Sequence, residues 1–274
     1  MSCSGWIIQP VMPEIDPPLT LPDDLPRIHA LAAHDRIAPC LHIVEQLRLA
    51  RQTYPELAQR TLALKRWQAQ RFAHTYTDVL IDPNMGPAAK FFLTELYSDK
   101  EYSERDAQFA RIAGTLERMF PQAVIHTATF LAQLHALSET LDANMVRVWL
   151  HHAHHLPDQL DETTYHQLWR ALMPVAGYAP ARQAQIQAAQ ELGQQLQRHT
   201  RLPGLRLMLR MMRAPATAAG LHQLQQFLEN GFDTFAQLGK AKKVEDFLRI
   251  IDQREHAWLD KMASVTISAN VKSS

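Results

Sequence analysis

The chain has 274 residues, of which 46% are hydrophobic and 20% are charged, as in an ordinary soluble globular protein. A chain of this length can bury a sizeable core without a metal ion or a disulfide framework. Its 28 lysines and arginines balance 28 aspartates and glutamates, so the net charge gives no reason to expect nucleic acid or an anionic membrane as a partner.

Cysteine usage and the first residues of the chain indicate a compartment. Cys3 and Cys40 form no CxxC pair, so we expect no disulfide framework and infer a reducing environment. The first residues lack the basic and then apolar regions of a secretion signal, and no apolar run reaches the length of a membrane span. These features predict a cytoplasmic protein with no membrane span.

Prolines and helix-forming residues divide the chain into three parts. Residues 1–27 contain six prolines and are predicted to form a flexible arm, because proline lacks the backbone donor that helices and strands use. Residues 28–262 are rich in helix formers and poor in glycine and β-branched runs, which predicts helices throughout. Residues 263–274 are predicted to be a flexible tail. The predicted fold is therefore all-α, with one multi-helix domain.

Apolar residues at helical spacing, bounded by proline and glycine, predict about nine or ten helices. No repeat period is present, so a solenoid is not expected. The expected helical segments are 28–52, 55–80, a short helix after Pro87, 103–119, 121–141 with a continuation to 157, 161–174, 180–201, a short helix within 201–213, 216–238 and 244–262.

The run KFFLTELYSDKEYSERDAQFAR, at residues 90–111, concentrates aromatic and charged residues. Phe91 and Phe92 are predicted to lie in the core, and Ser103 is predicted to cap the next helix. Glu95 and Tyr97 are candidates for contact with a ligand or a partner, because a buried tyrosine hydroxyl needs a hydrogen-bond partner. Most of this run is therefore expected to be a folding element.

The segment FFLTELYS, at residues 91–98, resembles the signature of a proteobacterial family named for its FFLEELY motif. The strings YSERDAQFAR, LHALSETLD and GFDTF also resemble that family, and the similarity extends over most of residues 40–260. The chain departs from the family pattern at Thr94, where the family has Glu, and at Ser98, where it has Gly. The resemblance implies a bacterial origin and one coherent domain, and it supplies no catalytic residues.

Histidines are abundant, with 14 in the chain, and several lie at metal-ligand spacing. His151 and His155 are four residues apart on one predicted helix, and Glu162 and His166 have the same spacing shortly after. Two imidazoles at this spacing can hold a zinc, nickel or copper ion, and the second pair could complete the site. The alternative is a polar helix end before Pro157.

His135 is the second candidate, because a leucine-rich helix with one histidine is similar to the proximal helix of a globin, in which one imidazole binds haem iron. The alternative is an ordinary core or half-exposed histidine. Acid–base or nucleophilic chemistry is a third possibility, because Ser138 lies three residues from His135 and six carboxylates lie near one another in the sequence: Glu95, Glu101, Glu104, Asp106, Glu139 and Asp142. No GxSxG, Walker or GxGxxG motif accompanies them, and carboxylates at such positions also fit solvated faces and helix caps.

The segment RLPGLRLMLRMMR, at residues 201–213, is basic and rich in methionine. Arg206, Arg210 and Arg213 are candidates for contact with a partner helix or an anionic ligand. No aromatic residues alternate with these arginines, so nucleic acid is not expected. The alternative is a helix with core leucine and methionine residues and a solvated arginine face.

The absence of catalytic signatures favours a non-catalytic protein that binds a protein partner or a small-molecule ligand, and a homo-oligomer is compatible with the sequence. One alternative is a sensor that holds haem at His135 or a metal ion among residues 151–166. Another is an enzyme with an unrecognised active site, which carboxylates with shifted pKa values in a cleft would favour. No cofactor is specified by the sequence.

Overall fold

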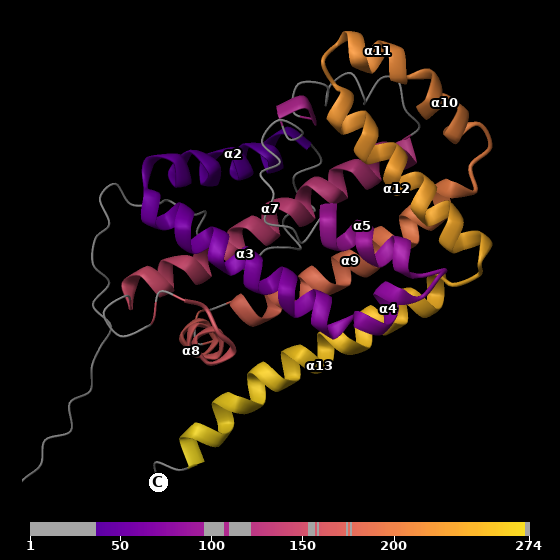
Figure 1. Cartoon of the computed structure of the whole chain (residues 1–274). Helices are drawn as coiled ribbons and strands as arrows, with labels where there is room; N and C mark the ends of the chain where they lie inside the picture. Colours follow the sequence, from indigo (N-terminus) through magenta and orange to yellow (C-terminus); the bar gives the residue numbers. More distant parts are fainter. Residues whose placement is uncertain are drawn as a thin grey trace, which may run out of the picture.

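The computed structural model describes residues 37–95, 107–109, 122–152, 157, 159–173, 175 and 177–271, with side chains described up to residue 263. Every element among these residues is an α-helix, and together they form one helical body (Figure 1). The all-α prediction is confirmed. The helices are α2 (Ile37–Thr53), α3 (Pro55–Thr75), α4 (Thr77–Ile81), α5 (Gly86–Glu95), α7 (Gln122–His151), α8 (Glu162–Leu172), α9 (Tyr178–Thr200), α10 (Leu205–Met211), α11 (Arg213–Ala218), α12 (His222–Lys240) and α13 (Val244–Val271).

Helix α7 is the longest helix and runs through the middle of the body (Figure 1). It contacts α2, α3, α8 and α9, so four other helices bury parts of its surface. Both α9 and α12 contact α13, and α10 and α11 lie on α12 at one end of the body (Figure 1). Burial on several sides explains why α7 carries buried residues all around its axis.

Local residues explain several helix boundaries. The carboxylate of Asp82 accepts hydrogen bonds from the backbone N–H groups of Asn84 and Met85, at 2.8 Å each, and so forms the turn before α5. Gly86 opens α5 where the chain passes close to the backbone of α4, because a Cβ atom there would lie 2.7 Å from the Leu80 carbonyl oxygen. Asp161 caps α8 by accepting from the Thr164 N–H at 2.7 Å.

Two expected helices are interrupted in the structure. The segment 55–80 divides at Tyr76 into α3 and α4. The segment 216–238 was expected to be one helix, but α11 ends at Ala218 and α12 begins at His222. Gly220 lies between them with a φ of 65°, a left-handed conformation that glycine adopts without steric cost and that ends α11.

The core contains the aromatic pair at the start of the FFLTELY run. Phe92 lies 5.7 Å from Phe247 in an edge-to-face arrangement, and Phe91 stacks on Phe227 at the same centroid distance. Both are buried, so the prediction that Phe91 and Phe92 belong to the core is confirmed. The second half of this run, including Tyr97 and Ser103, lies outside the described residues.

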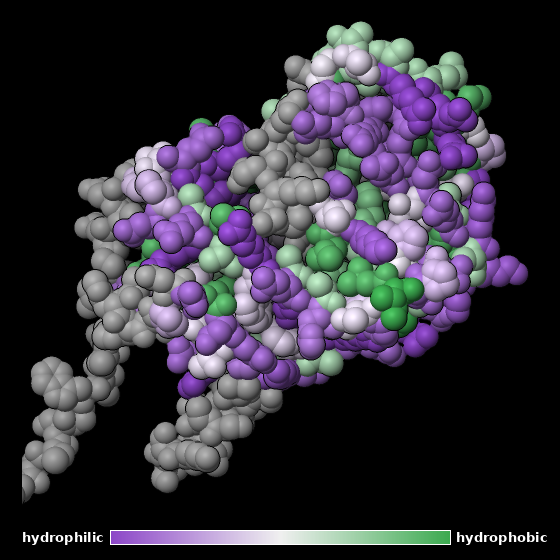
Figure 2. Space-filling model, viewed as in Figure 1, coloured by the Kyte–Doolittle hydropathy of each residue, from purple (hydrophilic) through white to green (hydrophobic). Residues whose placement is uncertain are grey.

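The surface in Figure 2 is mainly hydrophilic, with a hydrophobic area over α4 and α5. None of the helices among the described residues is long and apolar enough to cross a membrane. Helix α13 continues to Val271, beyond the predicted end of the domain at residue 262. The predicted arm at residues 1–27 lies outside the described part of the chain.

Candidate functional site

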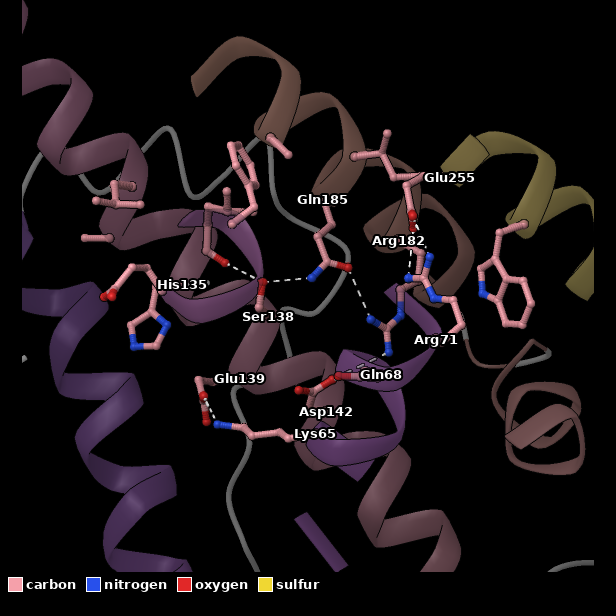
Figure 3. A pocket seen from close by; sticks show the side chains of 18 of the residues that line it. Lys65, Gln68, Arg71, His135, Ser138, Glu139, Asp142, Arg182, Gln185 and Glu255 are labelled. Carbon is pink, nitrogen blue, oxygen red and sulfur yellow. Dashed lines mark hydrogen bonds and ion pairs between the residues drawn. The ribbon is translucent and has the colours of Figure 1, made fainter. Parts of the chain in front are cut away.

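Four polar side chains of α7 line one interior cavity of about 130 Å³ (Figure 3). His135, Ser138, Glu139 and Asp142 follow the spacing of one helix face, at positions i, i+3, i+4 and i+7. The same cavity is lined by Lys65, Gln68 and Arg71 of α3, Arg182 and Gln185 of α9, and Glu255 of α13. Polar side chains from four helices therefore share one wall.

Glu139 is an anion of this wall that pairs with two cations. Its carboxylate accepts from Lys65 Nζ at 2.5 Å and from Arg51 Nη1 at 2.8 Å. Burial alone would raise the pKa of Glu139, but the charges of Lys65 and Arg51 outweigh it and lower the pKa to about 2. Glu139 is therefore an anion fixed between two cations. Its side chain is only 7% exposed, so the expectation of a solvated face is wrong here, because α7 is surrounded by other helices.

Asp142 lies one turn further along α7, and its pKa shifts in the opposite direction. Its carboxylate accepts from Gln68 Nε2 at 3.0 Å and lies 4.0 Å from Arg182 Nη2. Burial raises the pKa of Asp142 and outweighs the nearby positive charge of Arg182. Asp142 is 8% exposed, so here too the expected solvated face is replaced by a buried site. The pKa values of the two neighbouring carboxyl groups of α7 thus shift in opposite directions.

Arg182 connects α9 to this wall. Its Nε and Nη2 atoms donate to the Tyr178 hydroxyl at 3.1 and 2.9 Å, and Nη1 donates to Gln185 Oε1 at 3.1 Å. Gln185 Nε2 donates to Ser138 Oγ at 2.7 Å, and Ser138 donates in turn to the Leu134 carbonyl at 2.9 Å. Because Ser138 donates its proton to a backbone carbonyl, it is not arranged as an activated nucleophile.

A second ion pair in the cavity lining joins α3 to α13. Arg71 donates to both oxygens of Glu255, at 2.5 and 3.0 Å, and the Tyr76 hydroxyl donates to Glu255 at 2.9 Å. The Arg71 guanidinium also lies 5.3 Å from the ring centre of Trp258. This bidentate pair holds α13 against α3 at the cavity.

Trp169 of α8 lines the same cavity and has an unusual polar atom. Its side chain is 3% exposed, and its indole Nε1 is a buried donor without a hydrogen-bond partner. A buried N–H group without an acceptor is uncommon, because its desolvation is not compensated. The remaining wall of the cavity is apolar and is formed by Leu41, Phe92, Phe109, Leu131, Ala132, Ile186, Leu224, Phe227 and Leu259, among others.

Besides Ser138, Glu139 and Asp142, two of the predicted candidates reach this cavity. His135 and Glu95 both line it, although they come from separate helices. Tyr97 lies outside the described residues, so its predicted contact with a ligand or a partner stays a prediction.

The predicted metal ligands are only partly described. Glu162 accepts from Lys261 Nζ at 2.5 Å, and His166 Nε2 lies 3.7 Å from the same carboxylate. His151 has a buried Nδ1 without a hydrogen-bond partner, and His155 lies outside the described residues. Within the described ranges, no three histidine, cysteine or acidic side chains come together in a way that could hold a metal ion. The metal site stays a prediction.

The basic segment forms ion pairs with α12 at the surface. Arg206 donates to Asp233 at 2.8 and 3.1 Å, and Arg213 forms a bidentate pair with Glu229. Arg210 lines one pocket together with these two ion pairs. Leu205 and Leu209 are buried beneath, whereas Leu207 and Met211 are exposed. All three arginines are exposed, as the alternative of a solvated arginine face predicts. None of them lines the central cavity.

Six polar residues of the central wall were not among the predicted candidates: Lys65, Gln68, Arg71, Arg182, Gln185 and Glu255. Each lies in a long helix in which polar residues are frequent, so composition does not distinguish them. Lys65, Gln68 and Arg71 do follow the i, i+3, i+6 spacing of one α3 face. That spacing was the available signal, and it becomes informative only when α3 is known to face α7.

Comparison with known proteins gives a family and no function. Neither the curated proteins nor the solved structures include a match to this chain. A family model described as a domain of unknown function, DUF8198, matches residues 47–268. That range includes α3 to α12 and nearly all of α13, and therefore all polar residues of the central wall. The chain belongs to the DUF8198 family.

Proposed function

We propose that this protein binds a small amphipathic organic molecule in its central cavity. One observation carries the proposal: a cavity of about 130 Å³ is lined both by buried charged side chains and by aromatic and aliphatic side chains. A cavity of that volume holds several water-sized groups. Binding sites for small molecules combine apolar walls with a few convergent polar groups in this way.

Stability alone does not account for the polar wall. Replacing buried ion pairs by well-packed apolar residues is often neutral or stabilising. The wall nevertheless uses Glu139 with Lys65, and Glu255 with Arg71, each held by charged hydrogen bonds between different helices. Side chains fixed by such bonds present their remaining polar atoms in defined positions, which suits recognition of one ligand.

Filling the cavity tests the proposal. Ala189 lines the cavity and is half-buried, so Ala189→Phe places a ring in the space, whereas Ala123→Phe changes an exposed alanine of α7. The neutral fluorophore N-phenylnaphthylamine brightens in apolar surroundings and can be titrated into both variants. We expect saturable binding to the wild type and to Ala123→Phe, and at least about tenfold weaker binding to Ala189→Phe. Equal binding to all three proteins, or none to the wild type, would contradict the proposal, with circular dichroism checking that each variant folds.

Acid–base chemistry on the bound molecule is a second candidate, and a specific observation favours it. Glu139 and Asp142 lie one turn apart in one cavity, and their pKa values move in opposite directions. Such divergence is typical of carboxyl pairs that divide acid and base roles. Asp142 is the better-placed proton donor, because Glu139 is held by Lys65 and Arg51. An Asp142→Asn protein that binds ligand but converts none, where the wild type converts it, would support this candidate.

The finer expectations from the sequence also stay proposals. The FFLTELYS segment supports membership of the proteobacterial FFLEELY family, and the balanced charge and the low cysteine content support a cytoplasmic protein that binds no nucleic acid. His135 lines the cavity, which supports it as the place to test for haem. A protein partner at Arg206, Arg210 and Arg213, and a metal ion among residues 151–166, remain open to direct binding measurements.

A further inference from the structure

The hydroxyl group of Tyr165 is an open hydrogen-bond donor in the central cavity. Tyr165 of α8 lines this cavity and is 4% exposed, and its oxygen makes no hydrogen bond to a described residue. Trp169 Nε1 is fully enclosed, but the Tyr165 oxygen is not, so it keeps accessible surface in the cavity that its side chain lines. Burial raises the pKa of Tyr165, so the hydroxyl holds its proton and can donate it.

Tryptophan rings hold Tyr165 in place. Its ring stacks on Trp67 at a centroid distance of 4.0 Å and lies 6.2 Å from the rings of both Trp169 and Trp258. Aromatic contacts of this kind stabilise a buried ring in one orientation. Packing therefore sets the position of the hydroxyl without a hydrogen bond to the protein, which leaves the donor available to a bound molecule.

Arg182 of α9 brings further donors to the same cavity. An arginine has five N–H groups, and the three hydrogen bonds of Arg182 go to the Tyr178 hydroxyl and the Gln185 amide oxygen. One N–H on each Nη atom is left without a hydrogen bond to a described residue. The nearest described carboxylate oxygen, of Asp142, is 4.0 Å from Nη2, which is beyond hydrogen-bond distance. The lysine and the other arginine of the lining, in contrast, each donate to a carboxylate.

The electrostatic surroundings of these donors are positive. Four charged side chains influence the Tyr165 hydroxyl, and they gather in one part of the cavity (Figure 3): Arg182, Arg71, Asp142 and Glu255. The two arginines influence it more strongly than the two carboxyl groups do. Glu255 is already bound by Arg71, so Asp142 is the carboxyl group that balances Arg182. Burial raises the pKa of Asp142, and its protonated form leaves the charge of Arg182 uncompensated.

We infer that the molecule bound in the central cavity is a small carboxylic acid with an apolar body. This inference rests on the proposed function. The carboxylate accepts from the Tyr165 hydroxyl and from an N–H group of Arg182, and the apolar body packs on the aliphatic and aromatic side chains of the same cavity. A buried carboxylate needs both a positive charge and hydrogen-bond donors, and these two residues supply them. A protonated Asp142 adds a third donor in place of a competing charge.

Other head groups fit this part of the cavity less well. An ammonium group beside the Tyr165 hydroxyl would lie where the charges of Arg182 and Arg71 dominate. A neutral amide can accept from the hydroxyl, but it leaves the Arg182 charge without an anion. The inferred order of affinity is therefore acid first, then amide, then amine.

Three compounds with the same phenyl and alkyl body test this order: phenylpropanoate, phenylpropanamide and phenylpropylamine. Each can be titrated by calorimetry into the full-length wild type, Tyr165→Phe and Tyr54→Phe. We expect the wild type to bind the acid at least about tenfold more tightly than the amide, and the amine more weakly than the amide, because hydrogen bonds to a charged acceptor are the stronger ones. Tyr165→Phe removes only the hydroxyl, so acid binding should weaken at least about tenfold. Tyr54 does not line the cavity, so Tyr54→Phe should bind like the wild type.

The outcomes separate the inference from the proposed function. Equal binding of acid and amide, tightest binding of the amine, or acid binding that Tyr165→Phe leaves unchanged overturns the inference, while binding of N-phenylnaphthylamine keeps the proposed function in place. Fluorophore binding with no binding of the three phenyl compounds also overturns the inference alone. If neither the fluorophore nor any of the three compounds binds the wild type, both fail together.

Two measurements do not depend on the folding of Tyr165→Phe. The order of affinity among the three compounds needs only the wild type. Ala189→Phe, which fills the same cavity, should weaken the binding of phenylpropanoate at least about tenfold if the acid binds there. Circular dichroism checks that each variant folds. Unchanged acid binding by a folded Ala189→Phe protein would place the carboxylate site elsewhere and overturn the inference.

Discussion

Removing the negative charge of Glu139 should destabilise the fold strongly. Glu139→Gln keeps the size of the side chain but leaves Lys65 and Arg51 without their shared anion. The Lys65 and Arg51 side chains are 16% and 11% exposed, so water compensates them poorly. Breaking a buried pair by removing one partner typically costs about 3–5 kcal/mol.

The pKa of Glu139 gives an independent estimate of this loss. Its ordinary value of 4.5 is lowered to about 2 in the folded protein. The difference corresponds to about 3 kcal/mol of stability. Because the folded pKa is the lower one, this stability is fully present above the ordinary value and is lost as the pH falls towards about 2. The stability gap between wild type and variant should therefore narrow in acid.

Urea unfolding of the wild type and Glu139→Gln, followed by circular dichroism at several pH values, measures this gap. Asp233→Asn is the matched control, because Asp233 and Arg206 form an ion pair in which both side chains are about half exposed or more. We expect the control to lose less than about 1 kcal/mol of unfolding free energy. A Glu139→Gln loss no larger than that of the control, or a gap independent of pH, would refute the assignment of Glu139 as a buried anion.

Three further predictions concern other buried positions. Burial raises the pKa of Asp142 above its ordinary value of 3.8. The stability that Asp142 contributes is therefore present below that ordinary value and is lost as the pH rises through the pKa of the folded protein. In urea unfolding at neutral pH, Asp142→Asn should be at least as stable as the wild type. Gly193→Ala should lower the unfolding free energy by about 1–3 kcal/mol, because the new Cβ atom would lie 2.5 Å from Leu248 Cδ2, and equal thermal melting would contradict this contact. Cys40 is fully buried with a thiol pKa raised to about 11 by burial, so in a Cys3→Ser background a thiol reagent should label it only as urea unfolds the chain.

The sequence predicted the helices because their signals are local. Pro55 and Pro87 mark helix starts, and apolar spacing in 121–157 indicated the long helix that the structure shows as α7. The split of segment 216–238 at Gly220 was missed, because a single glycine is compatible with either a turn or a helix interior. The all-α class was therefore accessible from the sequence, and the breaks at Tyr76 and Gly220 were not.

The site was not predicted as one site. His135 was a candidate for haem binding, and Ser138, Glu139 and Asp142 belonged to a wider set of residues considered for acid–base or nucleophilic chemistry. Lys65 lies 74 positions from its partner Glu139 in the sequence, and Arg182 lies 40 positions from its partner Asp142. No local pattern links residues that are so far apart in the sequence. Their pairing depends on how α3, α7 and α9 pack, which is a tertiary property.

The buried carboxyl groups of α7 bear on the proposed ligand binding. A helix that several neighbours bury is expected to be mostly apolar. Helix α7 is contacted by four other helices, yet Glu139 and Asp142 are buried on it where it lines the central cavity. Burying two carboxyl groups costs desolvation free energy that well-packed apolar side chains would not incur. Their position at a cavity therefore supports the proposal that this cavity binds a molecule with polar atoms.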